Sequence, residues 1–299
     1  MKPKYEFHTA ADILKLTKKY NMPISELTKR YEMERSNKSV SAVRNKMKLT
    51  RDMMHDAIKK GVRSNEKSPM GISGGDARKL FKSTKKLSSM MGNRTTIKAM
   101  AYAMAIGEQN ACMGRIVAFP TAGGAGVVPG VLFSGADQLK GRKRKLLRGL
   151  FTASAIGLVI AERATLSAAK GGCQAEVGAG VAMAAAALTE MRDGTPEQCM
   201  HAAAIGLKSY LGLVCDPLGG LVEVPCIKRN AIGCMAAIGA SDMAISGIKS
   251  FIPFDEVVDA MKRVGDSMSP KLKETALGGL ATTKTGKIIK KKVCSKSQY

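Results

Sequence analysis

Three cysteines of this chain lie in local sequences that favour chemistry. Cys173, Cys215 and Cys226 each stand beside Gly or Pro residues, next to stretches with a small-residue helical pattern. A cysteine inside an intracellular protein either packs as a small hydrophobic residue or takes part in chemistry. Prolines and glycines interrupt helices between positions 215 and 226. We therefore expect Cys215 and Cys226 on turns, where their thiolates can point at one ion or cluster.

The elements that position these cysteines are expected to be helices. Hydrophobic residues make up 45% of the 299-residue chain, whereas aromatic residues make up 4% and Trp is absent. Cores rich in Ala and Met suit closely approaching helices better than half-buried strands, which prefer Val, Ile, Tyr and Thr. Residues 151–161, 181–191 and 196–211 carry hardly any charge and should lie inside. The sequence predicts an all-α, Ala/Gly/Met-rich body with amphipathic helices in residues 1–62.

The chain is strongly basic, with a formal net charge of +24. Lys and Arg concentrate in residues 1–98, 140–148 and 284–296, whereas residues 149–250 carry few charges. Such a surface is a solvated face, a match for an acidic subunit, or a surface for phosphate-bearing partners. No helix-turn-helix, zinc-finger or aromatic RNA-binding signature accompanies the charge, so we do not expect nucleic-acid binding as a main function.

Targeting signals are not visible in the sequence. Residues 1–20 are polar and rich in Lys, without the apolar core of a secretory signal. The longest apolar runs fall short of the roughly 20 residues that a membrane-spanning helix needs. The seven cysteines are odd in number and irregular in spacing, unlike a secreted disulfide framework. We predict a soluble, cytoplasmic protein that does not bind a membrane.

Longer motifs carry a resemblance to a known family. They are NACMGRIVAFPTAG (110–123), GGCQAEVG (171–178), the stretch from GTPEQC to RNAIG (194–233) and IPFDEVVDAM (252–261). In these segments, and over nearly its whole length, the chain resembles the alpha subunit of bacterial iron–sulfur-dependent L-serine dehydratase (L-serine ammonia-lyase). On this basis we expect a basic helical N-terminal region (1–98), a helical cluster-binding catalytic domain (99–282) and a basic C-terminal tail (283–299).

The resemblance implies a cofactor and a reaction. In that family, cysteines matching Cys173, Cys215 and Cys226 hold a [4Fe–4S] cluster, and this chain keeps all three. Four cysteines are the common arrangement, so three leave one iron open to act as a Lewis acid on the hydroxyl of L-serine. The implied product pair is pyruvate and ammonia, and the implied partner is a separate beta subunit in a hetero-oligomer. The alternatives are a cluster-dependent lyase acting on another β-substituted amino acid such as L-cysteine, and a non-catalytic basic binding protein with the same fold.

A Gly-rich loop at residues 114–130 is a candidate for substrate binding. It lacks the GK[ST] ending of a phosphate-binding loop, so we do not expect nucleotide binding. Its backbone amides can still face a carboxylate, although a tight turn between helices explains the glycines equally well. The resemblance favours the active site and points to Thr121 and Gly123. The usual family sequence TAGS is changed here, because Gly124 and Ala125 follow Gly123, which puts the substrate preference in question.

Polar residues directly after Cys226 form a second candidate. Lys228, Arg229 and Asn230 could anchor the substrate carboxylate or tune the electrostatic field at the cluster. The alternative is that they are surface residues at a helix N-terminus.

The sequence does not reveal the catalytic base. His201 lies in an Ala-rich helical segment, where a lone histidine is more often a core residue, and His8 and His55 lie in the polar N-terminal part. We leave the base unassigned and expect a partner chain to complete the site.

The remaining cysteines are less favoured as metal ligands or reactive thiols. Cys112, Cys199 and Cys234 lie in apolar helical runs and are expected to be buried. Cys294 lies on the basic tail, where it is either an incidental exposed thiol or a ligand that folds back to cap the open iron.

Overall fold

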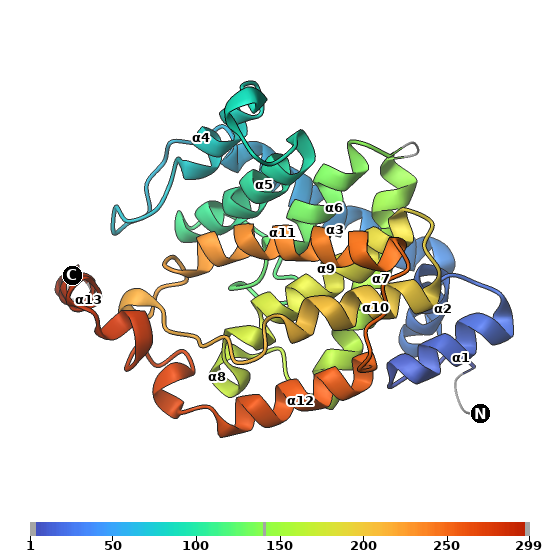
Figure 1. Cartoon of the computed structure of the whole chain (residues 1–299). Coiled ribbons are helices and arrows are strands. Elements are labelled where there is room, and N and C mark those ends of the chain that lie inside the picture. The colour runs from blue at the N-terminus through green and yellow to red at the C-terminus, as the bar shows by residue number, and fades with distance from the viewer. Residues whose placement is uncertain (1–3, 140–141, 297–299) are drawn as a thin grey trace.

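The chain folds into a bundle of helices. The computed structural model describes residues 4–139 and 142–296, and these ranges contain thirteen α-helices and several short 3-10 turns. Extended segments pair there at one isolated bridge, between Cys215 and Lys273. In Figure 1 the helices α9, α10 and α11 run across the middle of the molecule, with α12 along one side and α4 and α5 on the other. The all-α prediction is confirmed.

The α-helices range from four to 22 residues in length. None of the described helices is both long and apolar enough to cross a membrane. In chain order they are α1 (Ala10–Tyr20), α2 (Ile24–Ser36), α3 (Val40–Gly61), α4 (Asp76–Ser83), α5 (Arg94–Ala111), α6 (Val127–Ala136), α7 (Arg142–Arg163), α8 (Ala168–Gly171), α9 (Val177–Met191), α10 (Pro196–Lys208), α11 (Cys226–Ile245), α12 (Phe254–Ser267) and α13 (Lys284–Lys296).

Helix α9 is the centre of the fold, because every one of its residues is buried. It packs against α6, α7, α10 and α11. A helix can be enclosed on all sides only when small side chains let the neighbouring backbones approach, and alanine supplies them here. A Cβ on Gly206 of α10 would lie 3.0 Å from Cγ1 of Val181, and a Cβ on Gly233 of α11 would lie 3.2 Å from Cγ2 of the same valine. The predicted interior position of residues 181–191 is confirmed.

Helix α10 turns back onto α9 through a short, well-capped connection. Asp193 adopts a left-handed conformation with φ of 62°. The side chain of Thr195 then accepts a hydrogen bond from the amide of Gln198, whose side chain accepts one from the amide of Thr195. This reciprocal cap satisfies amides that the first helical turn leaves without partners, and Pro196 suits the first helical position.

A buried carboxylate joins the N-terminal helices to the central ones. Glu190 of α9 accepts hydrogen bonds from the amide of Ser25 (3.1 Å) and the hydroxyl of Thr152 (2.7 Å), and Nε of Arg148 lies 3.6 Å from it. Pro23, at the N-cap of α2, offers no capping side chain. Glu190 therefore accepts a hydrogen bond from the first turn of α2 in place of a capping side chain. The interaction links α2, α7 and α9.

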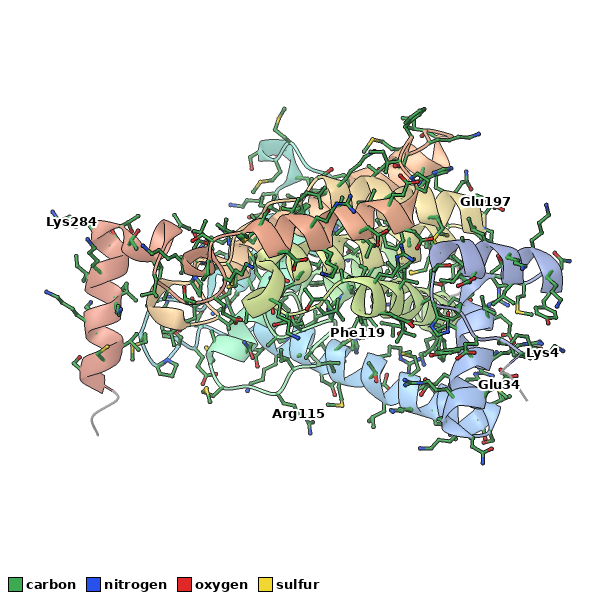
Figure 2. The ribbon with its side chains drawn as sticks, turned by 90° about the horizontal axis from the view of Figure 1, so that it is seen from below. Lys4, Glu34, Arg115, Phe119, Glu197 and Lys284 are labelled. Carbon is green, nitrogen blue, oxygen red and sulfur yellow. The ribbon has the colours of Figure 1, made fainter. Side chains whose placement is uncertain are left out.

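The C-terminal segment is helical rather than an irregular tail. Helix α13 packs against the 3-10 turns η3 (Leu218–Gly220) and η5 (Gly279–Thr282). Figure 2 shows Lys284 at one end of the molecule, with Lys4 and Glu34 toward the opposite end. The sequence predicted only a basic tail over residues 283–299, because the position of this helix depends on contacts with turns from elsewhere in the chain. The division into three regions stays a prediction.

Candidate metal centre

Two of the three predicted cysteines converge with a carboxylate, and the third lies nearby. Cys173 begins the 3-10 turn η2 (Cys173–Ala175), Cys215 follows α10 in a loop, and Cys226 is the first residue of α11. All three are buried. The Sγ atoms of Cys173 and Cys215 and a carboxylate oxygen of Glu176 lie within 4.8 Å of one another. Cys226 is outside this tight group. Burial, followed by the negative charge of Cys173, raises the pKa of Cys226 to about 12.

Hydrogen bonds fix the loops that carry the first two cysteines. The amide of Cys215 donates to the carbonyl of Leu272 (2.8 Å), and the carbonyl of Cys215 accepts from the amide of Glu274 (2.9 Å). The buried side chain of Gln174 accepts from the amide of Gly212 at 3.0 Å. These contacts join segments that are far apart in the sequence, so the thiols meet in a loop framework that is held from several sides.

The turn before Cys173 requires glycine. Gly172 has φ of 73° and ψ of −176°, a conformation that residues with a Cβ rarely adopt. A Cβ at this position would lie 2.7 Å from Sδ of Met268 and 2.9 Å from the carbonyl oxygen of Leu213. Glycine at position 172 therefore permits the backbone conformation that places Cys173 in the centre.

One arginine places positive charge beside the thiols. Arg229 donates to the carbonyl of Val214 (2.8 Å) and forms an ion pair with the buried Asp216 (2.9 Å). The hydrogen bond from Cys215 lowers the pKa of Cys173, and the charge of Arg229 acts in the same direction against the opposing effect of burial. The pKa of Cys215 is raised, chiefly because it donates that hydrogen bond. The thiolate is the form of cysteine that binds metals. A bound cation would therefore stabilise the deprotonated forms of Cys173 and Cys215 together.

Glu176 is the carboxylate of the centre. Its Oε1 accepts a hydrogen bond from the hydroxyl of Thr121 at 2.6 Å. Burial raises the pKa of Glu176, while the hydrogen bond from Thr121 lowers it and the charge of Glu274 raises it further. Glu176 lies in the GGCQAEVG motif, but its part in the centre was not predicted from the sequence. A single acidic residue next to a candidate ligand in a Gly-rich motif was the available signal.

The Gly-rich loop lies directly against Glu176. A Cβ on Gly123 would be 2.3 Å from Oε2 of Glu176, and a Cβ on Gly124 would be 2.6 Å from its carbonyl oxygen. Thr121 and Gly123 therefore both lie against Glu176, and their contact with a substrate stays a prediction. The absence of a side chain at Gly124 allows the loop to approach Glu176 this closely.

Asn230 connects the loop to α11. Its side-chain amide donates to the carbonyls of Gly123 (2.6 Å) and Cys226 (2.8 Å), and its Oδ1 accepts from the amide of Gly126 (3.0 Å). These bonds occupy the whole buried side chain. Lys228 is exposed and pairs with Asp76 of α4 at 3.3 Å. Among Lys228, Arg229 and Asn230, it is Arg229 whose positive charge lowers the pKa of Cys173.

The histidines lie apart from the group of thiols and carboxylate. His201 is half-buried on α10, and burial lowers its pKa. His8 contacts Glu162, and His55 stacks on Phe133 with ring centroids 5.6 Å apart.

The remaining cysteines also lie outside that group. Cys199 and Cys234 are buried, as expected. The expectation for Cys112 was wrong, because it caps the C-terminus of α5 and is half-buried, with its thiol donating to the carbonyl of Glu66 at 3.7 Å. Cys294 is exposed on α13.

Comparison with known proteins identifies the family. Residues 19–281 match the family described as serine dehydratase alpha chain. The chain belongs to this family. The probable L-serine dehydratase, alpha chain, of Bacillus subtilis is 47% identical over 290 residues, which cover 96% of this chain and 95% of that one. The L-serine dehydratase, alpha chain, of Peptoniphilus asaccharolyticus is 40% identical over 284 residues, covering 95% and 97%.

A longer relative shows how the family domain occurs in other chains. The L-serine dehydratase of Streptomyces coelicolor is 38% identical over 282 residues, which cover 93% of this chain but 61% of that protein. The resemblance deduced from the cysteine motifs is thus confirmed at the level of the serine dehydratase alpha chain family.

The close approach at Gly124 gives a stability prediction for this member of the family. Gly124→Ser introduces a Cβ 2.6 Å from the carbonyl oxygen of Glu176, and we expect a loss of about 1–3 kcal/mol in the free energy of unfolding. Urea unfolding measures the loss. The matched control is Gly239→Ser in α11, where a Cβ meets nothing within 4 Å. Equal stability of the two variants would contradict the packing described here.

Proposed function

We propose that this chain is the cluster-bearing alpha subunit of an L-serine dehydratase that converts L-serine into pyruvate and ammonia. The supporting observation is the buried convergence of Cys173, Cys215 and Glu176 beside Cys226. The names of the family and of its relatives agree with this activity. With all seven cysteines free, we also propose a cytoplasmic location, where thiols stay reduced.

The donor set fits a [4Fe–4S] cluster. Cysteine thiolates are the usual ligands of such clusters, and three buried thiols lie in one region here. Arg229 offsets part of the negative charge that three thiolates bring together. When bound through Cys173, Cys215 and Cys226, the cluster would supply Lewis acidity toward the hydroxyl group of the substrate.

The protein's own residues would handle the proton. Elimination from serine needs a base for the Cα proton, and Glu176 is the carboxylate that converges with the thiols of Cys173 and Cys215. Burial raises its pKa, which makes the ionised carboxylate a stronger base. The hydroxyl of Thr121 orients the carboxylate through its hydrogen bond. Loss of the proton and of the hydroxyl group leaves an enamine, which tautomerises and hydrolyses to pyruvate and ammonia.

The Gly-rich loop would bind the substrate carboxylate. The amide of Gly124 donates to the hydroxyl oxygen of Thr121 (3.3 Å), and the amide of Gly126 donates to Asn230 (3.0 Å). Within the described part of the chain, no hydrogen bond takes the amide of Gly123. This amide, together with the charge of Arg229, is our candidate for contact with the carboxylate.

A separate, acidic beta subunit would complete the enzyme as a hetero-oligomer. The net charge of +24 is a strong source of attraction for an acidic partner. The relative from Streptomyces coelicolor has a substantial part that this chain does not match. We propose that the beta subunit corresponds to that additional part.

Replacement of each proposed ligand tests the cofactor. We expect Cys173→Ser, Cys215→Ser and Cys226→Ser each to lose most of the iron after anaerobic reconstitution with iron and sulfide, because each removes one thiolate ligand. Iron analysis and the absorbance of the brown protein measure the loss. Cys199→Ala, at a buried cysteine outside the centre, is the control and should keep its iron. Full iron content in the Cys215 variant would overturn the assignment.

Replacement of Glu176 tests proton transfer. Glu176→Gln keeps the size and can still accept from Thr121, but it cannot take a proton, so we expect kcat to fall by about 100-fold or more. Iron content should stay at the parent level. The control is Glu274→Gln, an exposed carboxylate whose charge also reaches the centre. Parent-like kcat in the Glu176 variant with its cluster present would exclude this residue as the base.

Partner dependence tests the proposed assembly. The reconstituted chain alone should form little pyruvate from L-serine, and addition of the beta subunit should restore turnover. Because the attraction is electrostatic, raising the salt concentration should weaken the restored activity. Full activity of the isolated chain would remove the case for a required partner.

A further inference from the structure

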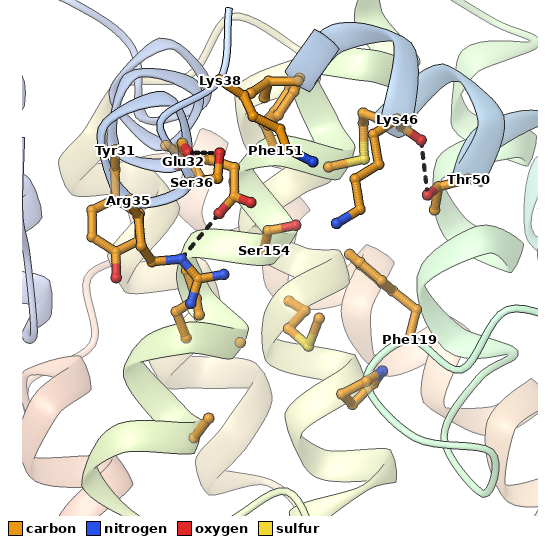
Figure 3. Close-up of a pocket in the computed structure, with 18 of the residues that line it drawn as sticks. Tyr31, Glu32, Arg35, Ser36, Lys38, Lys46, Thr50, Phe119, Phe151 and Ser154 are labelled. Atoms are coloured by element: carbon orange, nitrogen blue, oxygen red, sulfur yellow. Dashed lines mark hydrogen bonds and ion pairs between the residues drawn. The ribbon is translucent and has the colours of Figure 1, made fainter.

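A cavity lies in a part of the molecule that the three candidate cysteine ligands do not line. It has a volume of about 420 Å³ and opens between α2, α3 and α7, with the segment at residues 118–120 forming one wall. Figure 3 shows its lining, with the charged side chains contributed by α2, by α3 and by Lys38 in the connection between them. Its volume is in the range of roughly 300–1,000 Å³ that small-molecule sites occupy.

The floor of this cavity is apolar. Phe151 and Met183 are buried beneath it, Val43 is buried on the α3 side, and the half-buried Phe119 forms part of the wall. Gly157 keeps α7 free of a side chain at the same place. A ligand that fills this space would therefore bury an aliphatic or aromatic body against the floor.

The mouth of the cavity is cationic. Lys38 and Lys46 line it, and neither lysine forms an ion pair within the part of the chain that the structure describes. Figure 3 shows Lys46 and Ser154 pointing into the same space. The one carboxylate in the lining, Glu32, already pairs with Arg35 at 3.2 Å. The two unpaired ammonium groups leave a net positive charge above an apolar floor.

We propose that this cavity is a binding site for a small amphipathic anion, in which an apolar body carries one carboxylate, phosphate or sulfonate group. The apolar body would lie on Phe151 and Met183, and the anionic group would bind Lys38 and Lys46, with the hydroxyl of Ser154 within the same space. This site is independent of the proposed lyase chemistry, because it uses none of the residues of the metal centre.

The wall of the cavity is continuous with the metal centre. Phe119 and Pro120 line the cavity, and the next residue, Thr121, donates its hydroxyl to Glu176. A ligand in the cavity would touch the segment that positions Glu176. Binding can be measured without iron or substrate, so failure of this proposal and failure of the proposed function are distinguishable.

The first test uses two fluorescent dyes with the purified full-length chain. We expect 8-anilinonaphthalene-1-sulfonate, an apolar ring system with one sulfonate, to bind at one site per chain. Its neutral counterpart, N-phenyl-1-naphthylamine, should bind at least about tenfold more weakly, because it lacks the charge that the lysines recognise. Absence of saturable sulfonate binding, or equal affinity for both dyes, would overturn the proposal.

Charge variants locate the anionic group. Lys38→Gln combined with Lys46→Gln should weaken binding of the sulfonate dye by about tenfold. The control combines Arg44→Gln with Lys59→Gln, which removes two exposed cations of α3 that do not line the cavity. The control should bind as the parent does. Equal weakening in both double variants would show a general charge effect and would overturn the proposed site.

A steric variant locates the apolar body. Ala161→Phe places a ring at the exposed rim of the cavity, so the variant protein should fold with its core undisturbed. The ring should occupy the cavity and abolish binding of the sulfonate dye. Ala11→Phe, at an exposed alanine of α1, is the matched control. Thermal unfolding should confirm that both variants fold like the parent. Unchanged dye affinity in folded Ala161→Phe protein would place the dye elsewhere and would overturn the proposal.

Discussion

The complete burial of α9 is the constraint on which the rest of the structure depends. A helix enclosed on all sides leaves no room for large side chains at its crossings, so its neighbours must present glycine and alanine. The same enclosure means that any polar group on α9 must find a partner inside the protein. Glu190 does so by joining α2 and α7 to the centre.

The candidate metal centre lies where this enclosed helix begins. Glu176 immediately precedes α9, and Cys226 begins α11, which packs along α9. Both helices thus direct the positive ends of their dipoles toward the candidate ligands, which favours thiolates and other anions there. Asn230 fixes the Gly-rich loop to the first turn of α11. The helix packing that buries α9 therefore also sets the geometry of the centre.

The basic residues lie mainly at the surface and away from this interior. The central helices bury their small apolar residues, while lysines gather on the N-terminal helices and on α13. Two such lysines border the amphipathic cavity, and others are available for a partner. This arrangement explains how a chain with a net charge of +24 can hold several thiols and a carboxylate in a buried site.

Composition and motif sequence determined the all-α fold, the interior position of residues 181–191 and the three cysteines as candidates, whereas Ala161 and Glu197 of the other two Ala-rich segments are exposed. These features are local, since helical patterning and turn-forming glycines and prolines are properties of short segments. The tertiary structure alone decided the position of Glu176 beside the thiols, with its partner Thr121 55 residues away, and that of Asn230, which contacts Gly123 across 107 residues. It also decided that α13 is a packed helix and that a cavity opens beside Phe119. Each of these depends on which distant segments meet, and that is settled by how helices pack around α9 rather than by any stretch of sequence.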